Sequence, residues 1–241
     1  LVRPGGAANI PPPMPRPPEL APVPLSIKGS VYSSVLHRLA AWKGEVYPLH
    51  VGDTYLEPAE GCRMEDFSVS ESPGMHRYAP PQGLPALVDA VVERIRARTG
   101  VPLERANVFV AGGATSGLAS VVGAIVAPGD EVLLLAPHWP LIEGHVRMAG
   151  GVPVDVPFFG VATSAETAAA AVEAAVTPRT VALYVNTPSN PTGVVVPRPW
   201  LEALVGVARR RDLWLVFDEV YEEYVYRGEH VPGLSLAPER S

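Results

Sequence analysis

The chain has 241 residues, of which 47% are hydrophobic, so it can bury the core of one full domain or of one large domain with part of a second. Its 25 acidic and 19 basic residues give a net charge of -6, which argues against a broad basic surface for nucleic acid. The single cysteine, Cys62, excludes an intramolecular disulfide and a cysteine-only metal site, and it fits a reducing cytoplasm. We therefore expect a cytoplasmic protein with no metal site and no nucleic-acid partner.

The amino-terminal residues predict neither secretion nor a membrane anchor. They lack the ordered basic, apolar and small-residue regions of a signal peptide, and no apolar run in the chain reaches the roughly 18 residues of a membrane-spanning helix. Residues 1–25 are crowded with proline, which favours extended and weakly packed chain. We expect these residues to form an arm.

Three short elements are predicted before the main part of the chain. Apolar residues recur at helical spacing over residues 33–42, and residues 46–51 have the pattern of a short strand. A longer helix is predicted over residues 84–98.

Strands and helices alternate from Asn107 onward, and this rhythm predicts a parallel sheet with helices on both faces. Apolar runs such as residues 132–135 and 213–217 suit strands that are buried on both faces. The predicted strands cover residues 108–111, 131–135, 152–156, 181–185 and 213–217, and the predicted helices cover residues 116–126, 141–149, 165–176 and 199–211. The fold class is therefore α/β, with a mostly parallel sheet inside a three-layer αβα arrangement.

Ligands of open α/β sheets bind beyond the carboxyl ends of the strands, so the residues that follow each strand are the candidates for a site. The segment 112–117 places small residues and two hydroxyls before a helix, where backbone N–H groups could bind an anion. An ordinary N-cap explains this segment equally well. Trp139 follows the second predicted strand, where it could stack on a planar ring or simply fill core space.

Polar residues also follow the last two predicted strands. Asn190 lies in a turn fixed by two prolines and a glycine. Asp218 follows five apolar residues, and a carboxylate so close to a buried strand is costly unless a cation or a strong donor meets it. Tyr221 would lie on the same side as Asp218 if the chain leaves the strand in a helical or turn-like path. As an alternative, Asp218 could cap the segment that follows it.

The elements Asn190-Pro191-Thr192-Gly193 and Asp218-Glu219-Val220-Tyr221 stand in an order and spacing similar to those of class I/II aminotransferases, which are pyridoxal 5'-phosphate (PLP) enzymes of fold type I. The resemblance runs from about Asn107 to Ser241. Upstream, Tyr78 precedes Gly83 as in the family's Tyr-x-x-x-x-Gly signature. The resemblance implies a PLP-binding large domain over residues 76–241, incomplete at its carboxyl-terminal end, and a segment of residues 26–75 that contributes to a small domain and a substrate loop.

The resemblance assigns roles around the cofactor ring. Asp218 would pair with the pyridinium nitrogen and keep it protonated, so that the ring can accept electrons from the substrate carbanion. Asn190 and Tyr221 would donate hydrogen bonds to the 3-oxygen of the ring, and Trp139 would stack on it. Asp218 and Tyr221 are thus the expected catalytic residues of the chain.

The resemblance also implies contacts with the phosphate, the substrate and a second subunit. Ala114 through its backbone N–H, and Thr115 through backbone and hydroxyl, would bind the phosphate at a helix N-terminus. Tyr78 would reach the phosphate of the neighbouring subunit, which implies a homodimer with shared active sites. Gly52 would lie beside the bound amino acid.

The family's Schiff-base lysine, which also moves a proton during the reaction, comes a few tens of residues after the Asp-x-x-Tyr element. That position lies beyond Ser241, and the two lysines of the chain, Lys28 and Lys43, lie upstream and are interpreted as ordinary solvated residues. The arginine that binds the substrate carboxylate in this family would lie further on still. We therefore expect a fragment that carries most of a cofactor cradle without the catalytic lysine.

Three functions remain open from the sequence. The first is an aminotransferase of amino-acid metabolism, which moves an amino group between an L-amino acid and a 2-oxo acid in a ping-pong cycle. The second is a lyase, decarboxylase or synthase of the same fold, because one fold hosts several chemistries. The third is a non-catalytic truncated homologue that binds PLP weakly or serves as an interaction domain.

Overall fold

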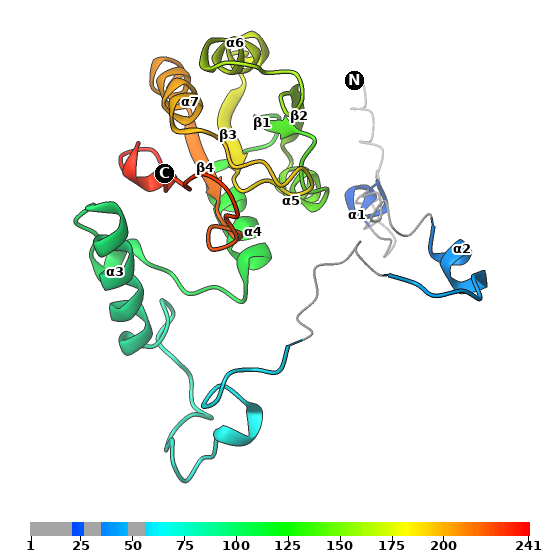
Figure 1. Cartoon of the computed structure of the whole chain (residues 1–241). Coiled ribbons are helices and arrows are strands. Elements are labelled where there is room, and N and C mark those ends of the chain that lie inside the picture. The colour runs from blue at the N-terminus through cyan, green and yellow to red at the C-terminus, as the bar shows by residue number, and fades with distance from the viewer. Residues whose placement is uncertain (1–20, 27–34, 48–55) are drawn as a thin grey trace, which may run out of the picture.

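A parallel four-stranded sheet forms the centre of the protein, as the computed structural model in Figure 1 shows. The structure describes residues 21–26, 35–47 and 56–241. All neighbouring strands are parallel and follow the order β2-β1-β3-β4. The strands are β1 (Glu131–Ala136), β2 (Val152–Pro157), β3 (Thr180–Asn186) and β4 (Trp214–Asp218).

Helices cover both faces of this sheet, so the predicted three-layer α/β arrangement is confirmed. Side chains of opposite parity along β1 and β3 point to opposite faces, as expected for strands. Those of Val132 and Tyr184 pack with a first pair of helices, α4 (Ala114–Ile125) and α5 (Leu141–Met148). Those of Leu133 and Leu183 pack with a second pair, α6 (Ala165–Ala175) and α7 (Arg198–Arg211).

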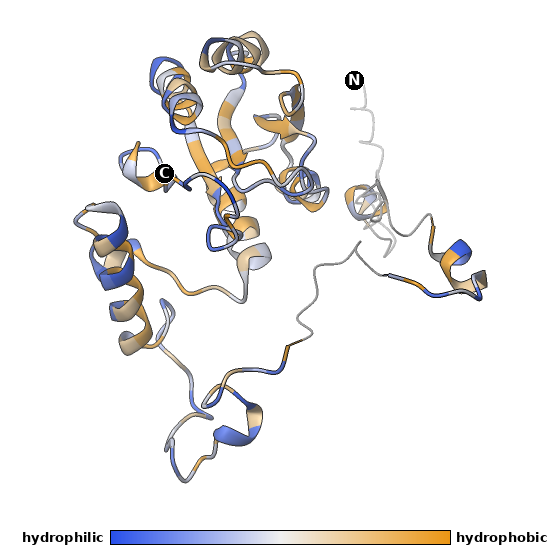
Figure 2. Ribbon diagram, viewed as in Figure 1, coloured by the Kyte–Doolittle hydropathy of each residue, from blue (hydrophilic) through white to orange (hydrophobic). Residues whose placement is uncertain are grey.

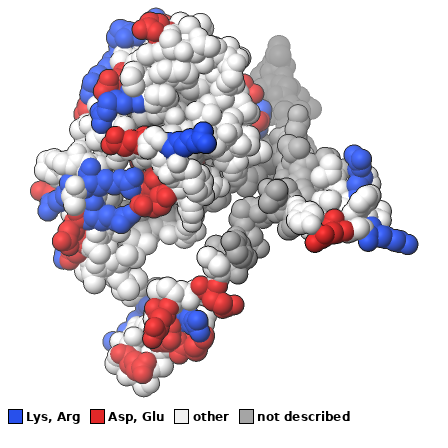
Figure 3. Space-filling view, viewed as in Figure 1, with Lys and Arg blue, Asp and Glu red and all other residues white. Residues whose placement is uncertain are grey.

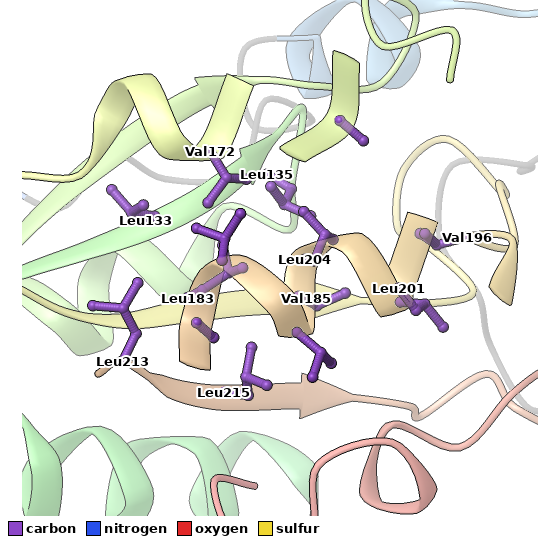
Figure 4. Close-up of a cluster of buried hydrophobic side chains, with 14 of the residues drawn as sticks. Leu133, Leu135, Val172, Leu183, Val185, Val196, Leu201, Leu204, Leu213 and Leu215 are labelled. Atoms are coloured by element: carbon purple, nitrogen blue, oxygen red, sulfur yellow. The ribbon is translucent and has the colours of Figure 1, made fainter. Parts of the chain in front are cut away.

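The larger apolar cluster lies between the sheet and the second pair of helices (Figure 4). Leu133, Leu183 and Leu201 have no exposed surface, and Leu135 and Leu204 are almost as deeply buried. Burying one such side chain stabilises a fold by about 1.5 to 3 kcal/mol. In Figure 2 much of the strand ribbon is coloured as hydrophobic, in agreement with strands that are buried on both faces.

Local sequence features fix the ends of these helices. Ser164 caps α6 by accepting a hydrogen bond from the Thr167 backbone N–H. Helix α7 has a proline in its first turn and is capped at its carboxyl end by Asp212, which adopts the left-handed conformation with φ 58°. Arginines 209–211 occupy its last turn, where positive charge interacts favourably with the helix dipole.

The outer strands of the sheet are β2 and β4. Beyond β4, the backbone N–H of Leu215 donates to the carbonyl of Arg240 over 2.9 Å, so the carboxyl-terminal segment covers part of this edge. Trp214, at the start of β4, is 51% exposed.

Residues before α4 form smaller elements that bury less apolar surface. The longest is α3 (Pro85–Thr99), whose buried residues are Val88 and Val92, and these pack with Val108. Arg94 and Arg98 of α3 pair with Glu223, and Arg98 also pairs with Glu222 at 3.0 Å. The other short elements are α1 (Pro22–Ser26), α2 (Leu36–Ala41) and the 3-10 turns η2 (Met64–Asp66), η3 (Arg105–Asn107) and, near the carboxyl terminus, η4 (Gly233–Ser235).

Three predicted elements differ from the structure. The strand predicted over residues 108–111 is wrong, because this extended segment joins no strand of the sheet and the Val110 backbone N–H donates instead to Gln82. Residues 46 and 47 form no strand, and the rest of the predicted strand 46–51 lies outside the described residues. The helix predicted over residues 33–42 is limited to residues 36–41, and the remaining boundaries agree to within two residues.

Charges of both signs are mixed on the face of the molecule that Figure 3 shows. Lys and Arg side chains lie beside Asp and Glu side chains there. Within the described ranges, no helix combines the length and the apolar character needed to cross a bilayer.

Candidate functional site

A cavity of about 170 Å³ lies where the carboxyl ends of β3 and β4 meet the start of α4. This is the place where parallel α/β sheets bind ligands. The cavity brings together six of the predicted site residues, which come from four separate parts of the chain. Its lining consists of Ala114, Thr115, Leu118, Trp139, Asn186, Asn190, Asp218, Val220 and Tyr221.

The start of α4 forms one wall of this cavity. The helix begins at Ala114 after Gly113, whose φ of 89° favours glycine over residues with a side chain. No side chain caps the helix, and the first backbone N–H groups of a helix have no partner within it. Ala114 and Thr115 are exposed, so these donors and the helix dipole are available to an anion.

Asp218 ends β4 and turns its carboxylate toward a buried tyrosine. Tyr184 Oη donates to Asp218 Oδ2 over 2.6 Å, and the Val220 backbone N–H lies 3.3 Å from Oδ1. Burial raises the pKa of the Tyr184 phenol far above its usual range, and the negative charge of Asp218 adds to this effect. Tyr184 is therefore a permanent donor that orients the Asp218 carboxylate, which can accept a further hydrogen bond from a cationic N–H.

Asn186 connects the ends of the two strands beside Asp218. Its side-chain Nδ2 donates to the Asp218 carbonyl over 2.9 Å, and its Oδ1 accepts from the Asn190 backbone N–H over 2.6 Å. The turn that carries Asn190 is thereby held against β4. Asn190 and Asp218 thus keep fixed relative positions on the cavity wall.

Tyr184 and Asn186 were not predicted as site residues. Asn186 is the last residue of β3 and is only 4% exposed, so the rule that polar residues at strand ends mark a site could have identified it. Tyr184 lies inside an apolar strand, where a tyrosine is ordinarily part of the core. Only the pairing of β3 with β4 brings its hydroxyl to Asp218.

Two aromatic side chains complete the lining. Trp139 lies between β1 and α5, is half-buried, and has its ring 6.0 Å from that of His145 at an interplanar angle of 43°. Tyr221 is 38% exposed and packs edge-on against Tyr224 at 6.5 Å. The cavity therefore offers a flat indole and a phenol to a planar ligand.

Glu219, the neighbour of Asp218, has a different role. Its Oε1 accepts from the Gly233 backbone N–H over 2.8 Å and lies 3.2 Å from His230 Nε2. Arg98 lies 3.4 Å from His230 Nδ1, and a guanidinium only donates, so Nδ1 accepts and Nε2 carries the proton. His230 Nε2 also lies 3.1 Å from the Thr187 carbonyl. This network ties α3 to the loops behind the cavity.

Of the remaining predicted residues, Tyr78 does not line the cavity. The side chain of Tyr78 is fully exposed, and Gly52 lies outside the described residues. Lys43 is exposed after α2, and Lys28 also lies outside the described residues. In the part of the chain that the structure describes, no lysine lines the cavity.

Comparison with known proteins identifies the family. The profile of the family "Aminotransferase class I and II" matches residues 48–239. The probable aspartate/prephenate aminotransferase of Thermus aquaticus is 44% identical over 171 residues, which are 70% of this chain and 44% of that protein. An arginine–pyruvate transaminase of Pseudomonas aeruginosa is 38% identical over 166 residues, which are 68% of this chain and 41% of that protein. The chain thus spans less than half the length of these relatives.

Solved structures of this family share the fold. A double mutant of Thermus thermophilus aspartate aminotransferase matches with a TM-score of 0.79 at 34% identity, over 92% of this chain and 59% of the other. Alanine aminotransferase from Pyrococcus furiosus matches with a TM-score of 0.77 at 29% identity, over 90% of this chain and 56% of the other. Proteins of this family are PLP-dependent and have fold type I. The chain therefore belongs to the class I and II aminotransferases.

Proposed function

We propose that this chain provides the PLP-binding part of an aminotransferase that moves an amino group between an L-amino acid and a 2-oxo acid in a ping-pong cycle. The observation that supports this proposal is the cavity itself. It places the N-terminus of α4, the Trp139 indole and the Asp218 carboxylate around one space of about 170 Å³. These groups complement a phosphate, a flat ring and a protonated ring nitrogen, respectively.

The donor set fits PLP group by group. The backbone N–H groups at Ala114 and Thr115, with the Thr115 hydroxyl, would hold the phosphate. The Asp218 carboxylate, oriented by Tyr184, would hold the proton of the ring nitrogen. Asn190 and Tyr221 would donate hydrogen bonds to the 3-oxygen. When bound, PLP supplies a ring that draws electrons from the reacting carbon of the substrate.

The surrounding residues would orient the ring. Trp139 would cover one face of the ring and exclude water from it. The hydrogen bonds of Asn186 would fix the distance between the 3-oxygen side and the nitrogen side of the site, because they join the Asn190 turn to Asp218. Such positioning matters because the chemistry responds to small displacements of the reacting groups.

We further propose a homodimer with shared active sites. Tyr78 supports this idea, because its fully exposed side chain lies outside the lining of its own cavity and is free to reach that of a second subunit. Gly52 would lie beside the substrate. The domain organisation that accompanies this proposal is an arm over residues 1–25, a contribution to a small domain over residues 26–75, and a PLP-binding domain over residues 76–241.

The proposal also covers the compartment and the substrates. The exposed free thiol of Cys62 is compatible with a reducing cytoplasm, where we place the protein in amino-acid biosynthesis. The similar proteins carry names that refer to aspartate, prephenate, arginine and alanine. Because these names point to different substrates, we propose an L-amino acid without choosing its side chain.

Titration of the chain with PLP tests the cavity as the cofactor site. Tryptophan quenching and equilibrium dialysis should show saturable binding of one equivalent. Asp218→Asn should weaken this binding about 10- to 100-fold, because a charge-assisted hydrogen bond contributes about 1.5 to 3 kcal/mol. As a matched control, Asp89→Asn changes an exposed carboxylate that pairs with Arg105, and it should leave PLP affinity unchanged.

Two results would contradict this assignment. Wild-type chain without saturable PLP binding would argue against the cavity, and equal affinity of Asp218→Asn would argue against the role of Asp218. The reaction class is tested in a longer protein that includes this chain. There, amino-donor profiling should yield a 2-oxo acid together with an aminated acceptor.

A further inference from the structure

Three potential metal ligands meet at the carboxyl ends of β1 and β2, outside the lining of the cavity described above. His138 precedes Trp139, Glu143 lies in the first turn of α5, and Asp155 lies on the outer strand β2. His138 Nε2 is 3.0 Å from Asp155 Oδ1 and 3.9 Å from Glu143 Oε1. The three ligand atoms all lie within 4.8 Å of one another.

The orientation of His138 directs its Nε2 at these carboxylates. Its side chain is 6% exposed, and its Nδ1 lies 3.1 Å from the carbonyl of Trp139. A carbonyl only accepts, so Nδ1 carries a proton and donates it. Nε2 therefore faces two carboxylates, and a positive charge at this point, carried by a second proton on the ring or by a metal ion, offsets their repulsion.

We propose that His138, Asp155 and Glu143 bind a divalent transition-metal ion such as Zn²⁺. Zinc binds histidine nitrogen and carboxylate oxygen at about 2.0 to 2.2 Å, so two of its ligand atoms lie about 3 to 3.5 Å apart. The pair of His138 and Asp155 already has this separation. Glu143 needs only a small side-chain rotation, which its 40% exposure allows.

The surroundings of the three side chains support this assignment. Histidine ligands of zinc ordinarily donate their other N–H to a carbonyl or carboxylate, as His138 does to Trp139. Arg147 lies 3.6 Å from Glu143 Oε2, so it partly neutralises that oxygen and leaves Oε1 on the side of His138. An imidazole ligand favours zinc and similar metals over Mg²⁺ and Ca²⁺, which prefer oxygen ligands.

An open hollow beside the cluster leaves space for water ligands. It has a volume of about 530 Å³, and its lining includes His138 and Asp155 together with apolar side chains such as Pro137, Phe158 and Val161. An ion here would connect the segment between β1 and α5, which carries Trp139, to the outer strand β2. The proposal rests on this geometry and is independent of PLP binding.

Isothermal titration of the purified, metal-free chain with Zn²⁺ tests the site. We expect saturable binding of one equivalent, visible d–d absorption when Co²⁺ replaces Zn²⁺, and no competition from excess Mg²⁺. His138→Asn and Asp155→Asn should each weaken Zn²⁺ binding by at least about tenfold, because even the groups that support metal ligands matter at this level. Glu143→Gln should cause a smaller loss.

The controls separate loss of a ligand from loss of the fold. Asp155 is 63% exposed in its side chain, so Asp155→Asn should keep the wild-type circular dichroism even if His138→Asn does not. His76→Ala changes an exposed histidine elsewhere in the chain and should keep wild-type Zn²⁺ affinity. The proposal is overturned if wild-type chain shows no saturable Zn²⁺ binding, or if folded Asp155→Asn binds Zn²⁺ as tightly as wild type.

Discussion

The sheet with its four covering helices and the segment that carries α3 are stabilised by different interactions. Leucines such as Leu133 and Leu183 are completely buried in the sheet, whereas α3 buries only Val88 and Val92 and is otherwise attached through ion pairs. A buried leucine contributes about 1.5 to 3 kcal/mol, and an exposed ion pair contributes about 0.2 to 1 kcal/mol. The cavity is therefore built on the strongly stabilised part of the chain, whereas α3 is held against it by weaker interactions.

The largest effect should come from Leu183→Ala, which removes a fully buried side chain between the sheet and α7. We expect the free energy of unfolding to fall by about 2 to 5 kcal/mol in urea denaturation. Leu87→Ala on α3 is the matched substitution, because Leu87 is 47% exposed. It should change stability by no more than about 0.5 kcal/mol. Equal losses of unfolding free energy in the two variants would contradict the proposed difference in stability between the two regions.

The second effect concerns a carboxylate buried at the amino end of β1. Glu131 Oε2 accepts from Thr177 over 2.5 Å, Thr180 lies 3.3 Å from the same oxygen, and Arg179 pairs with Oε1. Removal of the charge by Glu131→Gln should cost about 1 to 3 kcal/mol at neutral pH. Glu202→Gln in an exposed i,i+4 pair on α7 should change stability by no more than about 0.5 kcal/mol.

The effect of Glu131 should depend on pH in a defined direction. The hydrogen bond from Thr177, followed by Arg179 and Thr180, holds the pKa of Glu131 below its usual value of 4.5, although burial opposes this shift. A lowered pKa in the folded state gives stability that is present above about pH 4.5 and is lost as pH falls through the folded-state value. The stability difference between wild type and Glu131→Gln should therefore shrink on acidification, and a constant difference would contradict the assignment.

A smaller effect is expected from Tyr184→Phe, which removes the hydroxyl bonded to Asp218 and keeps the buried ring. The loss of one hydrogen bond should cost about 0.5 to 1.5 kcal/mol in stability. PLP affinity should also fall, because Asp218 loses the donor that orients it. Tyr224→Phe provides the control, since Tyr224 is 61% exposed and lies outside the cavity lining. Unchanged PLP affinity in Tyr184→Phe would show that Asp218 is positioned without this tyrosine.

The smallest effect on global stability should come from Arg98→Ala, which removes the pairs of α3 with Glu222 and Glu223 and its contact with His230. We expect less than about 1 kcal/mol in denaturation, but clearly faster amide hydrogen exchange within α3. Arg198→Ala, which breaks an exposed pair within α7, should not change exchange in α3. If α3 keeps its protection in Arg98→Ala, apolar packing of Val88 and Val92 holds it in place.

The sequence predicted the sheet and its helices well because long apolar runs and helical periodicity carry local information. The strand expected over residues 108–111 failed, although its composition is typical of a strand. Strand formation requires a neighbouring strand, and in the described chain Val110 finds only the carbonyl of Gln82.

The site was predictable only in part for the same reason. Asp218 and Asn190 stand at recognisable places after strands, so their types and positions pointed to a ligand. Tyr184 reaches Asp218 across the sheet, and the three proposed metal ligands come from a loop, α5 and β2. Tyr184 meets Asp218 through the pairing of β3 with β4, and Asp155 is brought to His138 through the pairing of β2 with β1, so neither contact follows from local spacing along the chain. This explains why the sequence predicted no metal site.

The outer edge of β4 has a consequence for handling the chain in the laboratory. The Arg240 carbonyl accepts the backbone N–H of Leu215 there, and an outer strand of a sheet is a template for intermolecular strand addition. The half-exposed indole of Trp214 adds an apolar surface at the start of the same strand, and such a surface favours association. Self-association of this polypeptide should therefore increase with its concentration. A charged substitution at Trp214 offers a direct way to improve its solubility.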